Sequence, residues 1–313
     1  MTTHSIMRRL GAVFAAWAAI SACGGEPDQA SSRSRAGERG AASAAAESEA
    51  KSLGNELREL EVRTRAASGR GDVGEAARLV ARGLALAAEG GAAQDVARGR
   101  FVLLRGNLAR HAGRTVDARR DYADAMALFR VRADDRGRFE VYLAEAELEE
   151  LQGDYAAAER QLAEAETLLP KIDDDRLRGA YQIRLGRLAF VRARYPDACA
   201  LYVDAAKSFS LAHEKRDQAE ALLLLAAAED SRGEAGLARR TLDKALAIFH
   251  ETDDKDGEVR ALHRLAGFAH RDGQVAKERS LLTRVRALYD ELGRRSDAVK
   301  VERQIASLPE SSN

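Results

Sequence analysis

The chain has 313 residues, of which 45% are hydrophobic and 5% aromatic, and this is enough for one large or two ordinary domains. Lysine plus arginine number 50 and aspartate plus glutamate number 50, so the balanced charge excludes a bulk basic field that would bind nucleic acid. Only four prolines occur, and the abundance of strong helix formers such as alanine and leucine predicts an all-α protein.

The first 23 residues have the pattern of an export signal. Arg8 and Arg9 provide a positive charge, and an apolar stretch follows from Leu10 to Ile20. This stretch is too short to span a bilayer, which takes about 20 apolar residues. Its length and flanks are typical of the apolar region of a cleaved secretory signal.

The end of this leader reads Ile-Ser-Ala-Cys at residues 20–23. It resembles the lipobox of bacterial lipoprotein signals, and the resemblance covers the leader alone. It implies cleavage after residue 22, acylation of Cys23 and a membrane anchor, because two or three acyl chains hold a protein permanently. Gly24 stands where an aspartate would favour the inner membrane, which implies an outer-membrane anchor facing the periplasm. An ordinary secretory leader with an incidental cysteine is the alternative.

Residues 24–49 are rich in glycine, serine, alanine and mixed charges and contain no aliphatic or aromatic core former. Such a segment cannot bury enough apolar surface to offset its ordering entropy, so we expect a flexible linker. The expected organisation is therefore a signal peptide (1–22), a lipidated Cys23 with its linker (23–50), a repeat domain (51–309) and a short tail (310–313).

The rest of the chain repeats with a period of 40 residues. We call the equivalent positions of successive repeats a column. The turn column consists of Gly113, Gly153, Ala193, Gly233 and Gly273, and the alanine column, five residues on, consists of Ala118, Ala158, Ala198 and Ala238. Three apolar columns follow at steps of four, three and four residues, beginning at Tyr122, Ala125 and Phe129. A looser copy begins at Gly71. A fixed period of this length is typical of stacked structural repeats.

Each repeat is expected to be a pair of helices joined by a short turn. The steps between the apolar columns place them on one stripe of a helix, and the preceding segment is also helical. Glycine suits the left-handed conformation that ends the first helix. We predict six repeats whose second helices begin near Val73, Thr115, Tyr155, Tyr195, Ala235 and Val275. A lone helix after Gly293, closed by Pro309, is expected to cap the stack.

The Gly-Asp-Tyr run at residues 153–155, with Ala158 and the Leu185-Gly186 pair, resembles the tetratricopeptide repeat (TPR). The resemblance covers about residues 52–308 and implies a right-handed TPR-like α-solenoid of about six helix-turn-helix repeats plus a C-terminal capping helix. The period of 40 is longer than the usual ~34 residues and is similar to that of long-helix variants in bacterial regulators and kinesin light chain. HEAT-type repeats are the alternative.

The TPR resemblance implies that the first helix of each repeat lines a concave groove. The expected lining consists of Arg100, Leu103, Asn107, Arg110, His111, Glu140, Leu143, Glu147, Glu150, Ile183, Arg187, Phe190, Glu220, Leu223, Ala227, Asp230, Arg260, His263, Gly267, His270 and Arg271. Its charge alternates along the stack, and charged residues mixed with apolar ones favour a protein or peptide segment over a small-molecule substrate. A concave face that is merely solvated is the alternative.

Two specialised sites are not expected in this groove. Some TPR receptors clamp a terminal carboxylate with lysine and asparagine, but only Asn107 matches part of that clamp and Leu103 stands where the lysine should be. His263 and His270 share a helix face but lie about 10 Å apart along the axis, too far for one zinc ion. We expect instead a groove end that can be protonated near neutral pH.

Catalytic signatures are also missing from the sequence. Cys199 is expected to be a small buried hydrophobe rather than a nucleophile. Glu145, Glu147, Glu149 and Glu150 are interpreted as mostly a solvated helix face. No glycine-rich phosphate loop, Gly-x-Ser-x-Gly motif or Cys-x-x-Cys pair occurs. The sequence therefore predicts neither an enzyme nor a cofactor.

The leading hypothesis is a non-catalytic, membrane-anchored scaffold that binds a protein or peptide and assists the assembly or tethering of envelope complexes. This analogy rests on the fold. Two alternatives stay open. One is a sensor in which a peptide ligand changes the superhelical pitch. The other is an envelope enzyme whose site involves His263 or His270.

Overall fold

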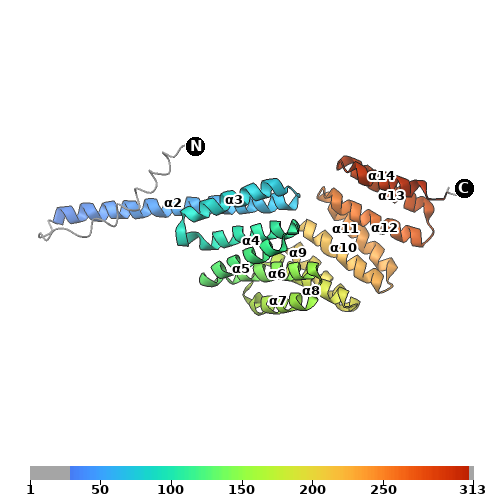
Figure 1. Cartoon of the computed structure of the whole chain (residues 1–313), viewed down its shortest axis with the longest axis horizontal. Helices are drawn as coiled ribbons and strands as arrows, with labels where there is room; N and C mark the ends of the chain where they lie inside the picture. Colours follow the sequence, from blue (N-terminus) through green and yellow to red (C-terminus); the bar gives the residue numbers. More distant parts are fainter. Residues whose placement is uncertain (1–28, 310–313) are drawn as a thin grey trace. The chain divides into compact units, whose positions relative to one another are not determined.

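The computed structural model describes residues 29–309, with side chains from residue 48 onward, and every regular element in that part of the chain is a helix (Figure 1). The leader, Cys23 and residues 310–313 lie outside the described residues. The helices are α2 (Gln29–Gly69), α3 (Val73–Glu89), η1 (Gly91–Gln94), α4 (Asp95–His111), α5 (Thr115–Val131), α6 (Asp135–Gln152), α7 (Tyr155–Leu168), η2 (Leu169–Lys171), α8 (Asp175–Val191), α9 (Tyr195–Leu211), α10 (Lys215–Ser231), α11 (Ala235–Glu251), α12 (Lys255–Arg271), α13 (Val275–Glu291) and α14 (Arg295–Ala306).

The predicted helix pairs are confirmed. The second helices α3, α5, α7, α9, α11 and α13 begin at the six predicted residues, and α14 is the lone final helix. We number the pairs repeat 1 (α2 and α3) to repeat 6 (α12 and α13). From α3 onward each α-helix packs against the next one along the chain. All five residues of the turn column have a positive φ, including the non-glycine Ala193 at 56°, as the left-handed end of a helix requires.

The segment expected to be a flexible linker differs from the prediction. Helix α2 begins at Gln29, so the backbone is helical where a random coil was expected up to Glu49. Alanine and glutamate are strong helix formers and no proline follows Gln29 within this helix, so local propensity favours a helix even without apolar residues. The compact unit that holds the repeats begins at Leu57 rather than at residue 51.

The predicted columns form the core of the stack. The four residues of the alanine column, Ala118, Ala158, Ala198 and Ala238, have no exposed surface. Tyr122, Leu162, Tyr202, Leu242 and Leu282, which make up the next column, are at most 1% exposed. Small side chains let neighbouring helices approach closely, and the larger apolar ones fill the remaining space.

Residue size is matched between the two helices of a repeat. A Cβ atom on Gly106 would lie 2.7 Å from the ring of Tyr122, and one on Gly186 would lie 2.5 Å from the ring of Tyr202. In the other three repeats the same two columns hold alanine and leucine: Ala146 with Leu162, Ala226 with Leu242, and Ala266 with Leu282. Glycine is therefore used where the partner is a ring.

Candidate functional site

Ion pairs connect the first helices of neighbouring repeats across the predicted concave face. Glu147 of α6 lies between Arg110 of α4 at 2.8 Å and Arg184 of α8 at 2.7 Å. Farther along, Arg271 of α12 pairs with Asp230 of α10 at 2.9 Å. The members of these pairs are 37 to 41 residues apart, close to one repeat period. The alternating charge seen in the sequence thus arises because equivalent faces meet and neutralise one another.

Glu147 is at the centre of this ladder. Its side chain is 22% exposed, while those of Arg110 and Arg184 are 7% and 16% exposed. Burial raises the pKa of Glu147, but the charges of Arg184 and Arg110 outweigh burial and hold it below its usual range. Glu150 is 3.6 Å from Arg184, and there burial dominates and raises its pKa.

The end of α2 adds residues that the sequence analysis missed. Arg65 pairs with Glu140 of α6 at 2.9 Å, and Glu61 pairs with Arg100 of α4 at 3.5 Å. Burial raises the pKa of Glu140, but the positive charges of Arg65, Arg176 and Arg136 outweigh burial and lower it overall. Arg65 lies in the incomplete first repeat, outside the regular columns, so the 40-residue spacing gave no signal for it.

The structure divides the predicted lining residues by exposure. Five are buried: Leu103, Arg110, Leu143, Ile183 and Leu223. Ten are half-buried: Arg100, Asn107, Glu140, Glu147, Glu150, Phe190, Glu220, Ala227, Asp230 and His263. Six are exposed: His111, Arg187, Arg260, Gly267, His270 and Arg271.

The four buried apolar residues of that set were wrongly predicted to line the groove. They belong to the hydrophobic core clusters between helices, because the neighbouring helices cover the side of the first helix on which they lie. Asn107 also has an internal role, since its side-chain oxygen accepts a hydrogen bond from the Tyr122 hydroxyl at 2.8 Å. The accessible part of the predicted surface is therefore smaller and more polar than expected, and most of it lies on α8 and α12.

A small pocket opens beside this accessible part. It has a volume of about 270 Å³ and lies between α10, α11 and α12, where Arg264, Gly267 and Phe268 are among its lining residues. The Phe268 ring has the guanidinium of Arg271 at 4.4 Å and that of Arg239 at 5.0 Å from its centroid. These cation–π contacts fix two arginines around the ring.

The interpretation of the glutamates at residues 145–150 as a solvated face was wrong. Glu149 is only 6% exposed, and Arg119 of α5 donates a hydrogen bond to it at 2.9 Å. Glu147 and Glu150 belong to the ion pairs described above, and Glu145 is half-buried. Helix α6 packs against α4, α5, α7 and α8, so little of its surface remains for solvent.

The histidines do not form the protonatable groove end that was expected. Burial lowers the pKa of His263, whose ring lies 6.2 Å from that of Tyr289. Burial and the charge of Arg110 lower the pKa of His111. Both side chains are therefore neutral at pH 7. His270 is 3.1 Å from Glu278 of α13.

Other predicted features were examined in the part of the chain that the structure covers. Cys199 is buried and unpaired, as predicted, and burial raises the pKa of its thiol. Within residues 29–309 there is no group of three or more histidine, cysteine, aspartate or glutamate side chains that could hold a metal ion. No helix in the same range has the length and apolar character needed to cross a bilayer.

Comparisons with known proteins bear on the fold. No family model and no curated protein matches the chain. A Rap protein complexed with Competence and Sporulation Factor matches with a TM-score of 0.57 and 14% identity, over 80% of this chain and 74% of that one. The Cut9-Hcn1 complex matches with a TM-score of 0.55 and 16% identity, over 78% of this chain and 42% of that one.

A third structure carries the same repeat by name. The TPR-like repeats of a putative kinesin light chain from Podosopora anserina match with a TM-score of 0.51 and 18% identity, over 63% of this chain and 97% of that one. At such low identities the likeness concerns the fold alone, and it favours TPR-like over HEAT-type repeats. Together with the helix pairs described above, these matches show that the chain folds as an all-α, TPR-like solenoid.

Proposed function

We propose that this chain is a non-catalytic scaffold that binds an acidic protein or peptide segment along the first helices α8, α10 and α12. The observation that carries the proposal is an excess of exposed arginine on this face. Glu220 and Asp230 each have an arginine partner. In contrast, Arg187 reaches only Glu150 at 3.9 Å, and Arg264 makes no ion pair with any described residue.

Arg264 belongs to this face because it occupies the same column as Arg184, which reaches the concave ion pairs. A guanidinium is well suited to hold a carboxylate, because its planar donors can engage both oxygens. Two structural neighbours were solved as complexes, a Rap protein with Competence and Sporulation Factor and Cut9 with Hcn1. They support a binding role by likeness of fold.

The binding face can be tested by reversing its two least engaged charges. In crosslinking pull-downs from membranes, the double variant Arg187→Glu and Arg264→Glu is expected to lose the partner that the wild type recovers, because an acidic segment would then face like charges. The control is Arg240→Glu, an exposed arginine on the second helix α11. Recovery of the same partner by the double variant and the control would contradict the proposal.

We further propose that acyl chains on Cys23 anchor the protein in the outer membrane, with the repeats in the periplasm, where the scaffold assists the assembly or tethering of envelope complexes. Support comes from the leader sequence, in which Cys23 follows an apolar stretch and two small residues. Two or three chains would make the attachment effectively permanent, whereas one would hold only marginally.

Replacing this cysteine tests the anchor directly. Cys23→Ser is expected to remove labelling by a fatty-acid analogue and to move the protein from the membrane fraction to the soluble fraction. Cys199→Ser is the matched control, because Cys199 is buried and is expected to carry no lipid. An acylated, membrane-bound Cys23→Ser variant would rule out this anchor and leave the groove proposal untouched.

A further inference from the structure

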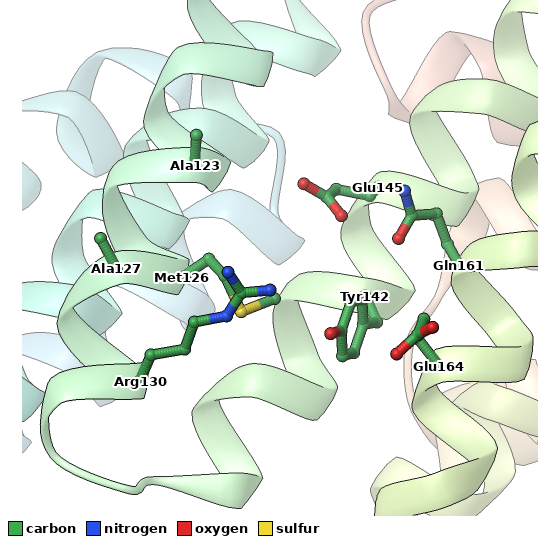
Figure 2. A pocket seen from close by; sticks show the side chains of 8 residues that line it. All are labelled: Ala123, Met126, Ala127, Arg130, Tyr142, Glu145, Gln161 and Glu164. Carbon is green, nitrogen blue, oxygen red and sulfur yellow. The ribbon is translucent and has the colours of Figure 1, made fainter.

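A second pocket lies away from the concave face, between α5, α6 and α7 (Figure 2). Its volume is about 490 Å³, within the range of small-ligand sites. Met126 and Arg130 of α5 line one side, and Tyr142, Glu145, Gln161 and Glu164 of α6 and α7 line the other. Figure 2 shows the side chains of Arg130 and Glu145 on opposite sides of the space.

The columns of Glu145 and Gln161 behave differently in the other repeats. In repeat 2 they hold Arg105 and Asp121, which form a two-pronged ion pair at 2.9 Å and 2.7 Å. Repeats 4 to 6 instead place leucine in the first of these columns and leucine or threonine in the second, namely Leu185 with Leu201, Leu225 with Thr241, and Leu265 with Leu281. Repeat 3 is therefore neither ion-paired nor apolar at this point.

Glu145 has a negative charge without a counter-ion in contact. It makes no ion pair and no side-chain hydrogen bond with any residue that the structure describes, although it is half-buried. Burial and the charge of Glu149 raise the pKa of Glu145, while Arg119 and Arg130 act in the opposite direction from a distance. A cation placed next to this carboxylate would relieve the cost of burying it.

The remaining lining residues suit the stem of such a cation. Met126 and Tyr142 are each 6% exposed and present a thioether and an aromatic ring at the pocket. An alkyl chain can pack on these groups, and a positive head group is attracted to a carboxylate and to an aromatic face. The side-chain oxygens of Gln161 and Glu164 add two further acceptors.

We propose that this pocket binds an alkyl-guanidinium or alkylammonium group, with Glu145 as its counter-ion and with Met126 and Tyr142 packing on its stem. The group would take the place that the Arg105 guanidinium takes beside Asp121 in repeat 2. The site is on a different face from the groove proposed to bind an acidic segment, so it gives the protein a second, oppositely charged specificity. Arg130 is the like charge across the pocket and limits its affinity.

Calorimetric titration of the full-length protein in detergent tests this site. Two probes distinguish the source of the cation: agmatine represents a free ligand, and N-acetyl-arginine amide represents a side chain within a polypeptide. The wild type is expected to bind at least one of them, Glu145→Gln to bind about tenfold more weakly, and Arg130→Gln to bind more tightly. Asp243→Asn, an exposed acid on α11, is the control and is expected to bind as the wild type does.

Glu145→Leu provides a second, fold-preserving variant, because repeats 4 to 6 all have leucine in this column. It is expected to fold and to lose all binding. Binding of agmatine alone would assign a free cation, and binding of both probes would admit a partner's arginine. Undetectable binding of both probes by the wild type, or unchanged affinity in Glu145→Leu, would overturn the proposal. Binding by Arg130→Gln but not by the wild type would also overturn it, because Arg130 would then be the resident counter-ion.

Discussion

Glu147→Gln is expected to lower the free energy of unfolding by about 3 kcal/mol at pH 7, although Glu147 lies on a face predicted to bind a partner. The carboxylate holds two guanidiniums, on Arg110 and Arg184, that are at most 16% exposed. Removing one member of a buried charge cluster leaves the others uncompensated, which costs more than the loss of a surface pair. Urea unfolding followed by circular dichroism measures the change.

Glu220→Gln is the matched control for this substitution. It removes the same chemical group from the pair with Arg260, but the two side chains are 34% and 47% exposed. The expected loss is less than about 1 kcal/mol, because exposed ion pairs contribute little. Equal losses in the two variants would show that the position of Glu147 between two arginines has no special weight.

The pH dependence of the Glu147 effect has a definite sign. The folded-state pKa of Glu147 is lowered, so its contribution to stability is fully present above the unfolded value of about 4.3 and is lost as the pH falls through the folded value. The difference in unfolding free energy between wild type and Glu147→Gln is therefore expected to shrink below about pH 4. A difference that stays constant down to pH 3 would mean that the ionised carboxylate is not its source.

This result has a consequence for the proposed groove. Charge reversal at Glu147 or Arg260 would disturb contacts between repeats, so a lost partner would not identify the docking face. Arg187 and Arg264 are better probes because neither has a close ion pair with a described residue. Stability and recognition share the same face, but different residues carry them.

The sequence alone was sufficient to locate the helices of the repeats. A constant 40-residue spacing with glycine or alanine at each turn identified the first residue of all six second helices, including Thr115 and Tyr195. Helix α2 was missed from Gln29 onward because it has no apolar periodicity, and only its propensity favours a helix. Patterning detects helices that bury a stripe, and a helix without a stripe leaves no such signal.

The candidate site was less predictable, for a reason of geometry. A column identifies a helix face but does not show how far the neighbouring helices cover it, so Leu103 and Ile183 were placed in the groove although they are buried. Arg184 was overlooked beside Ile183, and only the structure shows it reaching Glu147 at 2.7 Å. The pocket at Glu145 did leave a sequence signal, since glutamate stands there in a column that is leucine in the next three repeats.

Gly186→Ala is expected to destabilise the protein by about 2 to 3 kcal/mol, even though alanine is the better helix former. The added Cβ would lie 2.5 Å from Cε1 and 2.8 Å from Cδ1 of Tyr202, a buried ring that has no room to move. Overpacking of this kind costs about 1–3 kcal/mol and exceeds the gain of up to about 1 kcal/mol in helix propensity. Gly267→Ala is the control, because a Cβ there meets nothing within 4 Å. It is expected to be neutral or stabilising.

The partner substitution shows whether size matching is the cause. Tyr202→Leu alone is expected to destabilise by leaving a cavity, but Tyr202→Leu combined with Gly186→Ala recreates the alanine–leucine pair found at Ala146 with Leu162. The double variant is therefore expected to be more stable than the sum of the single effects predicts, with a coupling of about 2 kcal/mol in a double-mutant cycle. Additive losses would mean that the glycine and the ring occupy these columns for independent reasons.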